Sequence, residues 1–535
     1  MLVIRIRGHV ALAVVLLSLS ASRASAQDLG TRPGELTQDL RTSHVCNGCH
    51  GAYADYAADD TWRGSMMANA ARDPLFHAAL TIANQDIPGS GEMCIRCHSP
   101  RAYLFGRADP PDATALEPDD FDSINCDFCH RLVEGPDGIR PIGMGQYFVA
   151  DDVVRRGPIR ETVAPHETAY SEYHRDSALC GLCHDVSNPF RGGFPIERTY
   201  TEWLSSAYPA EGWSCMSCHL PGEPGTAAGA RGLPNRIVHR HELAGGNTWM
   251  PLVLAAEHPE LERDASYRAT SEAARRQLQE SSAEIGIVAP AESTAGEALD
   301  IVVRVENQTG HKLPTGYTEG RLCWLEVTVD DADGERILHS GAYDPDAGRR
   351  VSRDADPQLR TYEARTSAGG VEGFHFVLQD GVIEDTRIPP RGFVPDDETI
   401  PVGRDYPMQP DGTLAHWDEA PYRIAIPRGA RGPLTIRATL WYQTASREYV
   451  EFLRDDNHTD DNGRHMFDLW ERHGRSPPVD MVASTVTVEV RPAPDGGCSV
   501  TGSSQSYGRF STASLSMVLA LCFARRRRTR RYLGG

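Results

Sequence analysis

The sequence lacks an apolar run long enough for a stable transmembrane helix. The apolar stretches 10–19 and 515–524 span ten residues each, which is about half of what a bilayer-crossing helix needs. The first stretch follows two arginines and precedes the small-residue triplet Ala24-Ser25-Ala26, an arrangement typical of a cleavable secretory signal rather than a membrane anchor. We therefore expect residues 1–26 to be a signal peptide and the protein to be exported through the inner membrane.

Basic residues are scarce in the body of the chain. The net charge is −20, yet residues 1–26 carry three arginines and no acidic residue, and residues 498–535 carry seven arginines and no acidic residue, which leaves −30 for the middle. Such a body repels nucleic acid and anionic lipid and attracts a basic protein surface. We expect no nucleic-acid function, and partner proteins with a basic docking face.

Long apolar elements are also few before residue 260, where one cysteine pattern recurs instead. Ten of the thirteen cysteines fall in five copies of Cys-x-x-Cys-His. Two thiols at this spacing can bond to the vinyl groups of one haem, while the adjacent histidine binds the iron. The copies, called motifs 1 to 5 in chain order, are Cys46, Cys49, His50; Cys94, Cys97, His98; Cys126, Cys129, His130; Cys180, Cys183, His184; and Cys215, Cys218, His219.

Two other kinds of site in proteins are also built from paired cysteines. Zinc sites combine Cys-x-x-Cys units, and thioredoxin-like proteins use one such pair for redox chemistry. A zinc site does not require a histidine directly after each pair, and a redox pair has no reason to occur five times. The pattern therefore predicts five covalently attached haem c groups.

The occupant of the sixth iron position separates an electron carrier from a catalyst. His166 and His174 lie in the stretch before motif 4, and His241 follows motif 5. We expect these three histidines to be sixth ligands. Met66 or Met67 and His44 are weaker candidates, since a methionine on a helix more often serves packing.

A further ligand is expected from His311, in the stretch NQTGHKLPTGY (307–317). Gly310 and Gly316 permit a sharp loop and Pro314 stiffens it, so the imidazole would be held at a fixed place. We predict that His311 reaches one of the five irons from a second domain.

The composition changes along the chain and predicts five segments. After the signal peptide we expect a loop-rich, mostly α-helical haem domain, a helical linker and an all-β domain. Alternating apolar residues typical of strands occur in the last of these, with a hairpin turn at Asp333-Gly334, which favours an antiparallel immunoglobulin-like β-sandwich. The expected boundaries are 1–26, 27–256, 257–283, 284–492 and 493–535, and the expected strands are 299–307, 322–330, 434–444 and 484–492.

Residues 40–250 resemble the multihaem cytochrome superfamily that contains hydroxylamine oxidoreductase, pentahaem nitrite reductase and a tetrahaem cytochrome. The resemblance is carried by the repeated motifs, by TEWLSSAY (201–208) and by the histidines around motif 4. It implies closely stacked haem pairs in a mostly helical, loop-rich fold. The chain departs from the catalytic members, because it contains no Cys-x-x-Cys-Lys motif and no identifiable tyrosine cross-link.

The last segment carries a second resemblance. GCSVTG (497–502), followed by the apolar stretch and an arginine cluster, resembles the C-terminal sorting signal of myxobacterial surface proteins. This resemblance implies that Cys498 is processed and lipid-linked, and that the protein is anchored in the periplasm or at the outer surface.

Three functions are compatible with these features. The first is electron transfer between redox partner proteins through five haems. The second is a multihaem oxidoreductase in which one iron with an open sixth position acts on a small nitrogen or sulfur compound. The third is a binding module whose β-domain docks a partner.

Overall fold

The computed structural model describes residues 29–229, 232–317 and 319–494. The expected signal peptide and the expected sorting signal with Cys498 lie outside these residues. Within the described ranges, no helix combines the length and the apolar character needed to cross a membrane.

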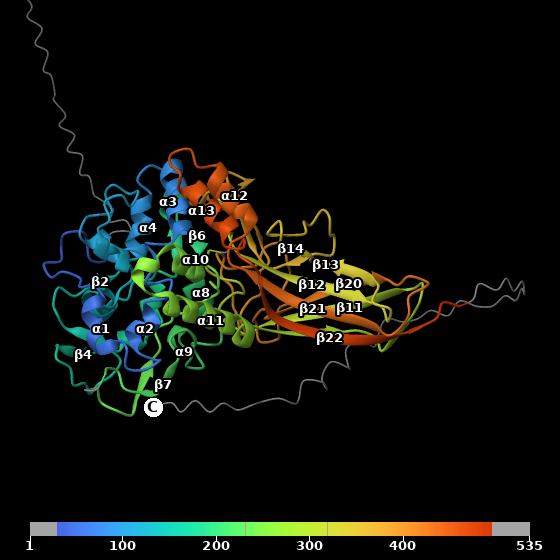
Figure 1. The fold of residues 1–535 in the computed structure, drawn as a ribbon, viewed down its shortest axis with the longest axis horizontal. Coiled ribbons are helices and arrows are strands. Elements are labelled where there is room, and N and C mark those ends of the chain that lie inside the picture. Colours follow the sequence, from blue (N-terminus) through green and yellow to red (C-terminus); the bar gives the residue numbers. More distant parts are fainter. Residues whose placement is uncertain (1–28, 230–231, 318, 495–535) are drawn as a thin grey trace, which may run out of the picture. The chain divides into compact units, whose positions relative to one another are not determined.

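The first half of the chain is built from short helices joined by long connections (Figure 1). Helix α3 is the longest before α11, and Asp73 caps its start by accepting a hydrogen bond from the amide of Leu75. The helices are α1 (His44–His50), α2 (Ala58–Trp62), α3 (Pro74–Asp86), α4 (Gly91–His98), α5 (Pro100–Leu104), α6 (Cys126–Arg131), α7 (Ala178–Gly181), α8 (Thr199–Leu204), α9 (Cys215–His219) and α10 (Met250–Glu257).

Four two-stranded sheets accompany these helices. They pair β1 with β2, β3 with β4, β5 with β6 and β7 with β8. The mostly helical character expected for this region stays a prediction, since loops and short strands share it with the helices. The strands are β1 (Leu132–Val133), β2 (Phe148–Val149), β3 (Arg155–Gly157), β4 (Thr168–Tyr170), β5 (Val186–Asn188), β6 (Phe194–Glu197), β7 (Gly222–Gly225) and β8 (Arg236–His239).

Helix α11 (Asp264–Ser281) lies within the expected linker and leads into the long strands of the second half. One sheet has the order β20-β11-β9, and a larger one has the order β10-β22-β21-β12-β13 with β16 beside β12. The long strands are β9 (Ala283–Val288), β11 (Ala298–Asn307), β12 (Leu322–Asp330), β20 (Trp417–Ala425), β21 (Leu434–Gln443) and β22 (Val479–Arg491). The shorter ones are β10 (Glu292–Thr294), β13 (Arg336–Ser340), β14 (Tyr343–Asp344), β15 (Arg349–Arg350), β16 (Arg360–Thr361), β17 (Ala364–Ala368), β18 (Val371–Glu372) and β19 (Gly381–Asp385).

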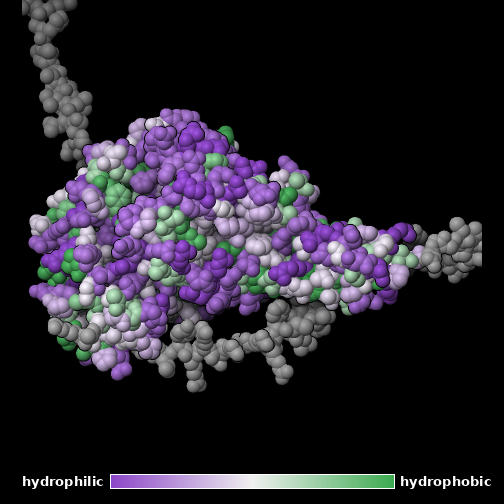
Figure 2. Space-filling view, in the orientation of Figure 1, coloured by the Kyte–Doolittle hydropathy of each residue, from purple (hydrophilic) through white to green (hydrophobic). Residues whose placement is uncertain are grey.

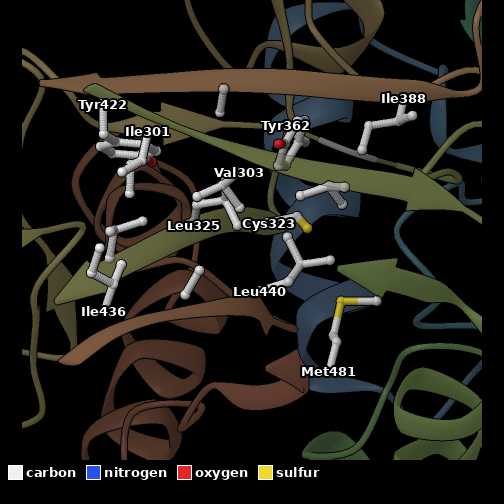
Figure 3. Packing of buried hydrophobic residues seen from close by; sticks show 14 of the residues in the cluster. Ile301, Val303, Cys323, Leu325, Tyr362, Ile388, Tyr422, Ile436, Leu440 and Met481 are labelled. Atoms are coloured by element: carbon white, nitrogen blue, oxygen red, sulfur yellow. The ribbon is translucent and has the colours of Figure 1, made fainter. Parts of the chain in front are cut away.

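Both sheets contribute to one apolar core. Strand β11 turns every second side chain inward, as its alternating sequence predicts. Figure 3 shows Ile301 and Val303 of this strand in the same core as Leu325 and Leu440 of the larger sheet. The predicted turn at Asp333-Gly334 does connect β12 and β13. The immunoglobulin-like assignment of this region stays a prediction.

The expectation that the second half is all-β is wrong. Helices α12 (Arg447–Asp455) and α13 (Asn462–Arg472) lie between β21 and β22. They pack against α3 of the first half, so that segments from opposite ends of the sequence lie side by side (Figure 1). Trp470 and Leu453 share a buried cluster there with Trp249. These helices attach the second half to the first by apolar packing.

The face of the molecule seen in Figure 2 is predominantly hydrophilic. In Figure 2, hydrophilic residues cover most of the visible face, and hydrophobic ones are scattered among them. This distribution agrees with the high acidic content of the sequence.

Candidate functional site

Each of motifs 1, 2, 3 and 5 lies on a short helix that ends at or one residue after its histidine. Motif 5 is α9 itself, and motif 3 begins α6, where the side chain of Asn125 accepts a hydrogen bond from the amide of Phe128. Motif 4 starts on α7 and continues beyond it. Residues three and four positions apart share one face of a helix. The two thiols and the imidazole of such a motif are therefore presented together.

The orientation of three motif histidines is set by the backbone. Nδ1 of His50 lies 2.7 Å from the Ala227 carbonyl oxygen, Nδ1 of His130 lies 2.6 Å from that of Arg156, and Nδ1 of His219 lies 2.6 Å from that of Ala244. An imidazole that donates from Nδ1 keeps the lone pair of Nε2 for a metal. These contacts therefore prepare Nε2 for iron.

Three motif histidines also face a second histidine. The ring centres are 6.4 Å apart for His50 and His166, and 6.5 Å apart for His130 and His241. Two imidazoles that bind one metal from opposite sides, each at about 2 Å through Nε2, have ring centres roughly 6 Å apart. The two pairs therefore have the spacing of axial ligands. Nδ1 of His166 and Nδ1 of His241 lie near backbone carbonyls, as in the motif histidines.

The third pair joins the two halves of the chain. The rings of His219 and His311 lie 6.4 Å apart and are inclined by 17°. His311 leaves the end of β11, and Nδ1 of its ring is 2.9 Å from the Lys312 carbonyl oxygen. His311 therefore lies beside a motif histidine, and its role as a ligand stays a prediction.

The loop that carries His311 fits closely onto α8. A Cβ added to Gly310 would lie 3.1 Å from the Trp203 ring, so glycine allows this close approach. The Tyr208 hydroxyl donates a hydrogen bond of 2.8 Å to the Gln308 carbonyl. Gly316 has a φ of +81°, which turns the loop back as the sequence predicts.

His174 also lies near His130, with ring centres 5.7 Å apart. Both of its ring nitrogens have protein partners, because Nδ1 is 2.9 Å from the Ser171 hydroxyl and Nε2 is 2.9 Å from the Cys129 carbonyl. Among the described residues, Nε2 of His241 has no hydrogen-bond partner, because its hydrogen bond is made through Nδ1, and so that nitrogen is left for iron. Of the two histidines expected to serve as ligands here, the geometry favours His241.

Burial keeps several of these imidazoles neutral. It lowers the pKa of His98, His219 and His241 to about 4 in each case, against partial compensation from nearby carbonyl groups. A histidine binds a metal in its neutral form. At neutral pH, these rings are therefore in the state that iron requires.

The thiols of different motifs lie close together. Cys94, Cys129 and Cys183, one thiol each of motifs 2, 3 and 4, pack against the same apolar core. The amide of Cys215 in motif 5 donates a 3.1 Å hydrogen bond to the Ser177 hydroxyl, directly before the helix α7 that carries the start of motif 4. Motif 1 joins this group at motif 3, because the amide of Arg41, shortly before α1, donates a 2.8 Å hydrogen bond to the Asp127 carboxylate inside motif 3. All five motifs therefore form one connected group, and their cysteines are free thiols in the structure.

His98 and His184 differ from the other motif histidines. The ring of His98 stacks on Phe76 at 4.3 Å, and Nδ1 of His184 lies 3.5 Å from a carboxylate oxygen of Glu197. Within the described residues, neither faces a second imidazole. Met66 packs against the cluster around Trp249, and Met67 against the core of the haem-motif region.

Two acidic residues around motif 4, the half-buried Glu197 and the buried Glu202, were not expected from the sequence. Glu197 lies on β6, and Glu202 on α8 is fully buried. A single glutamate in a short, irregular segment matches no sequence motif. Its role becomes visible only from the residues packed around it in the structure. Only TEWLSSAY, which contains Glu202, was recognised as part of a resemblance.

The residues present fit covalently bound haem. Each motif supplies two free thiols and one imidazole, and three motifs add a second imidazole at axial spacing. In the described part of the chain, no group of three or more His, Cys, Asp or Glu side chains is arranged to hold a metal ion by itself.

Comparison with known proteins found one similar fold. No protein-family model and no curated protein matches the chain. The crystal structure of a penta-haem cytochrome c552 from Thermochromatium tepidum is similar, with a TM-score of 0.52 and 19% sequence identity, over 84% of this chain and 99% of that chain. At this identity the likeness shows the fold alone. The chain has the fold of a multihaem cytochrome, with helices and a large share of β-sheet.

Proposed function

We propose that this protein is an exported pentahaem c-type cytochrome that transfers electrons. The observation that carries the proposal is the connected group of five motifs, which share one apolar core and the hydrogen bonds beside it. The similarity to a penta-haem cytochrome adds support from the fold. Haem c supplies an iron that gains and loses single electrons. The chain holds the five attachment points next to one another and sets their surroundings.

The histidine pairs define the ligands that we propose for three of the irons. His166 would complete motif 1, His241 motif 3 and His311 motif 5, because each presents its ring at axial spacing. A filled sixth position suits electron transfer, since the iron keeps its ligands in both oxidation states. The acidic body would attract basic redox partners, and anchoring through Cys498 would keep the protein in the periplasm or at the outer surface.

Five covalent haems are expected in the mature protein. Each motif offers two thiols, and the resulting thioether bonds survive denaturation, so mass spectrometry of the denatured protein should find five haems per chain. A Cys215→Ala, Cys218→Ala variant should carry four. Fewer than five haems in the parent, produced with the complete maturation machinery, would refute the fivefold attachment.

The two histidines beside His130 should behave differently. Replacing His241 with alanine should open the motif 3 iron, giving a high-spin signal in electron paramagnetic resonance and one additional carbon monoxide-binding haem. Replacing His174 should leave the iron low-spin, because both of its ring nitrogens are engaged by protein groups. A high-spin signal in the His174 variant alone would reverse this assignment.

A further inference from the structure

Glu319 is a buried carboxylate without a basic partner. It lies two residues after Tyr317, beyond the loop that carries His311, and it is 7% exposed. Its Oε1 accepts a hydrogen bond of 3.4 Å from the Thr366 hydroxyl on β17, and in the described residues Oε2 has no hydrogen-bond partner. Burying a charged carboxylate without a partner is costly, so such a group favours its neutral form.

The other buried acidic groups beside this segment are paired. Asp385 contacts Lys312 at 2.6 Å and Arg387 at 2.7 Å, and Arg387 also contacts Glu202 at 2.9 Å. Two acidic and two basic side chains therefore balance one another in this network. Among the described residues, no lysine, arginine or histidine forms an ion pair with Glu319. Its carboxyl group is therefore left without a counter-charge.

The segment 311–319 runs beside two of the haem motifs. Its first residue faces His219 of motif 5, with ring centres 6.4 Å apart. Tyr317 packs against the buried cluster that contains side chains of α3, and Phe76 on the same helix stacks on His98 of motif 2. Charges in a protein interior act on one another with less screening than in water. The carboxylate at the end of the segment therefore senses the charge of an iron held by these motifs.

The titratable groups that act on Glu319 keep their charge states near neutral pH. Burial raises the pKa of Glu319 itself to about 7, against the opposing charge of Arg387. Burial also raises the pKa of Tyr317 and Tyr449, so both phenols stay neutral. Arg387 and Asp385 stay charged, because their pairing outweighs the effect of burial on the pKa of each. Glu319 is therefore the group of this set that changes its charge near neutral pH.

We propose that Glu319 is a proton-binding site linked to the redox state of the haems, which binds a proton from solvent when a neighbouring iron is reduced and releases it when that iron is oxidised. This inference rests on the proposed electron-transfer function and deepens it, since a proton accompanies the electron. The step is balanced, because the iron gains one electron from a redox partner, changing from Fe(III) to Fe(II), while one O–H bond forms on the carboxylate. The added negative charge favours the neutral carboxyl group.

The test follows the midpoint potentials of the fully matured protein as a function of pH. Below about pH 7 the carboxyl group of Glu319 is protonated in both redox states and contributes no pH dependence. Above this pH, the midpoint potential of at least one haem should fall as pH rises, by up to about 59 mV per pH unit, which is a tenfold change in the equilibrium constant. Glu319→Gln should lose this fall, and Glu319→Asp, which keeps a carboxyl group, should retain it.

Infrared spectroscopy gives a second readout, which a purely structural role of Glu319 would not produce. The reduced-minus-oxidised difference spectrum of the parent, recorded just above pH 7, should contain the C=O stretching band of a protonated carboxylic acid. The band should shift in D₂O, because the acid proton exchanges with solvent. It should be absent from the spectrum of Glu319→Gln.

Glu363→Gln is the matched control. Glu363 is also 7% exposed, but its carboxylate pairs with Arg350 at 3.3 Å and with Arg353 at 2.7 Å. This variant should keep the pH dependence and the infrared band of the parent. A potential–pH curve that is the same in the parent and in Glu319→Gln would overturn the proposal, and so would a band that persists in Glu319→Gln. Haem count and reversible reduction of all haems test the electron-transfer function separately, and both can hold when the potentials do not depend on pH.

Discussion

Replacing His311 with alanine is expected to convert one low-spin iron to the high-spin state. His311 faces His219 with ring centres 6.4 Å apart, and its loop is held by contacts to α8 and by the hydrogen bond from Asn307 to its carbonyl, 2.8 Å long. Loss of the imidazole leaves the motif 5 iron with His219 alone. Electron paramagnetic resonance should show a new high-spin signal, and carbon monoxide titration should show one more binding haem than in the parent.

His339→Ala is the control for this experiment. His339 lies in the same half of the chain, on β13, but its ring contacts Glu326 and no motif histidine. Its removal should leave the spectra unchanged. If the His311 variant has the spectrum of the parent, then the loop does not supply a ligand, and no iron joins the two halves through His311.

The second large effect is expected from Asp385→Ala. Asp385 binds Lys312, the only lysine of the sequence, at 2.6 Å and Arg387 at 2.7 Å, and Lys312 is fully buried. Arg387 also pairs with Glu202 on α8 at 2.9 Å. Removing one partner of a buried ion pair leaves an uncompensated charge, which costs about 3–5 kcal/mol. The midpoint of chemical unfolding, followed by circular dichroism, should fall accordingly.

Lys312 follows His311 directly, so the same variant should disturb the ligand. Asp385→Ala should therefore also show part of the high-spin signal that His311→Ala produces. Asp300→Ala removes the partner of Arg423, in a pair whose two side chains are 67% and 70% exposed. Exposed ion pairs contribute little to the free energy of unfolding. The unfolding midpoint of this control should therefore lie close to that of the parent. Equal midpoints for the two aspartate variants would show that the buried network does not hold the halves together.

Strands whose formation depends on residues close together in the sequence were predicted near their observed positions. The strands β11, β12, β21 and β22 lie where apolar and polar residues alternate, because a period of two places every second side chain on one face. Helices α12 and α13 were missed although Met466, Leu469 and Trp470 have helical spacing. The apolar faces of the two helices pack against α3, a contact between distant segments that no local pattern reveals.

The sequence by itself located the five candidate haem-attachment motifs, because two thiols and an imidazole within five residues are brought together by a single helical turn. The sequence also indicated which histidines were candidates for the sixth iron position. Only the tertiary structure decided that His166 faces His50, that His241 rather than His174 has a free nitrogen beside His130, and that Glu197 reaches His184. These contacts join residues that are distant in the chain. They depend on how loops and sheets pack, and that packing is a property of the whole molecule.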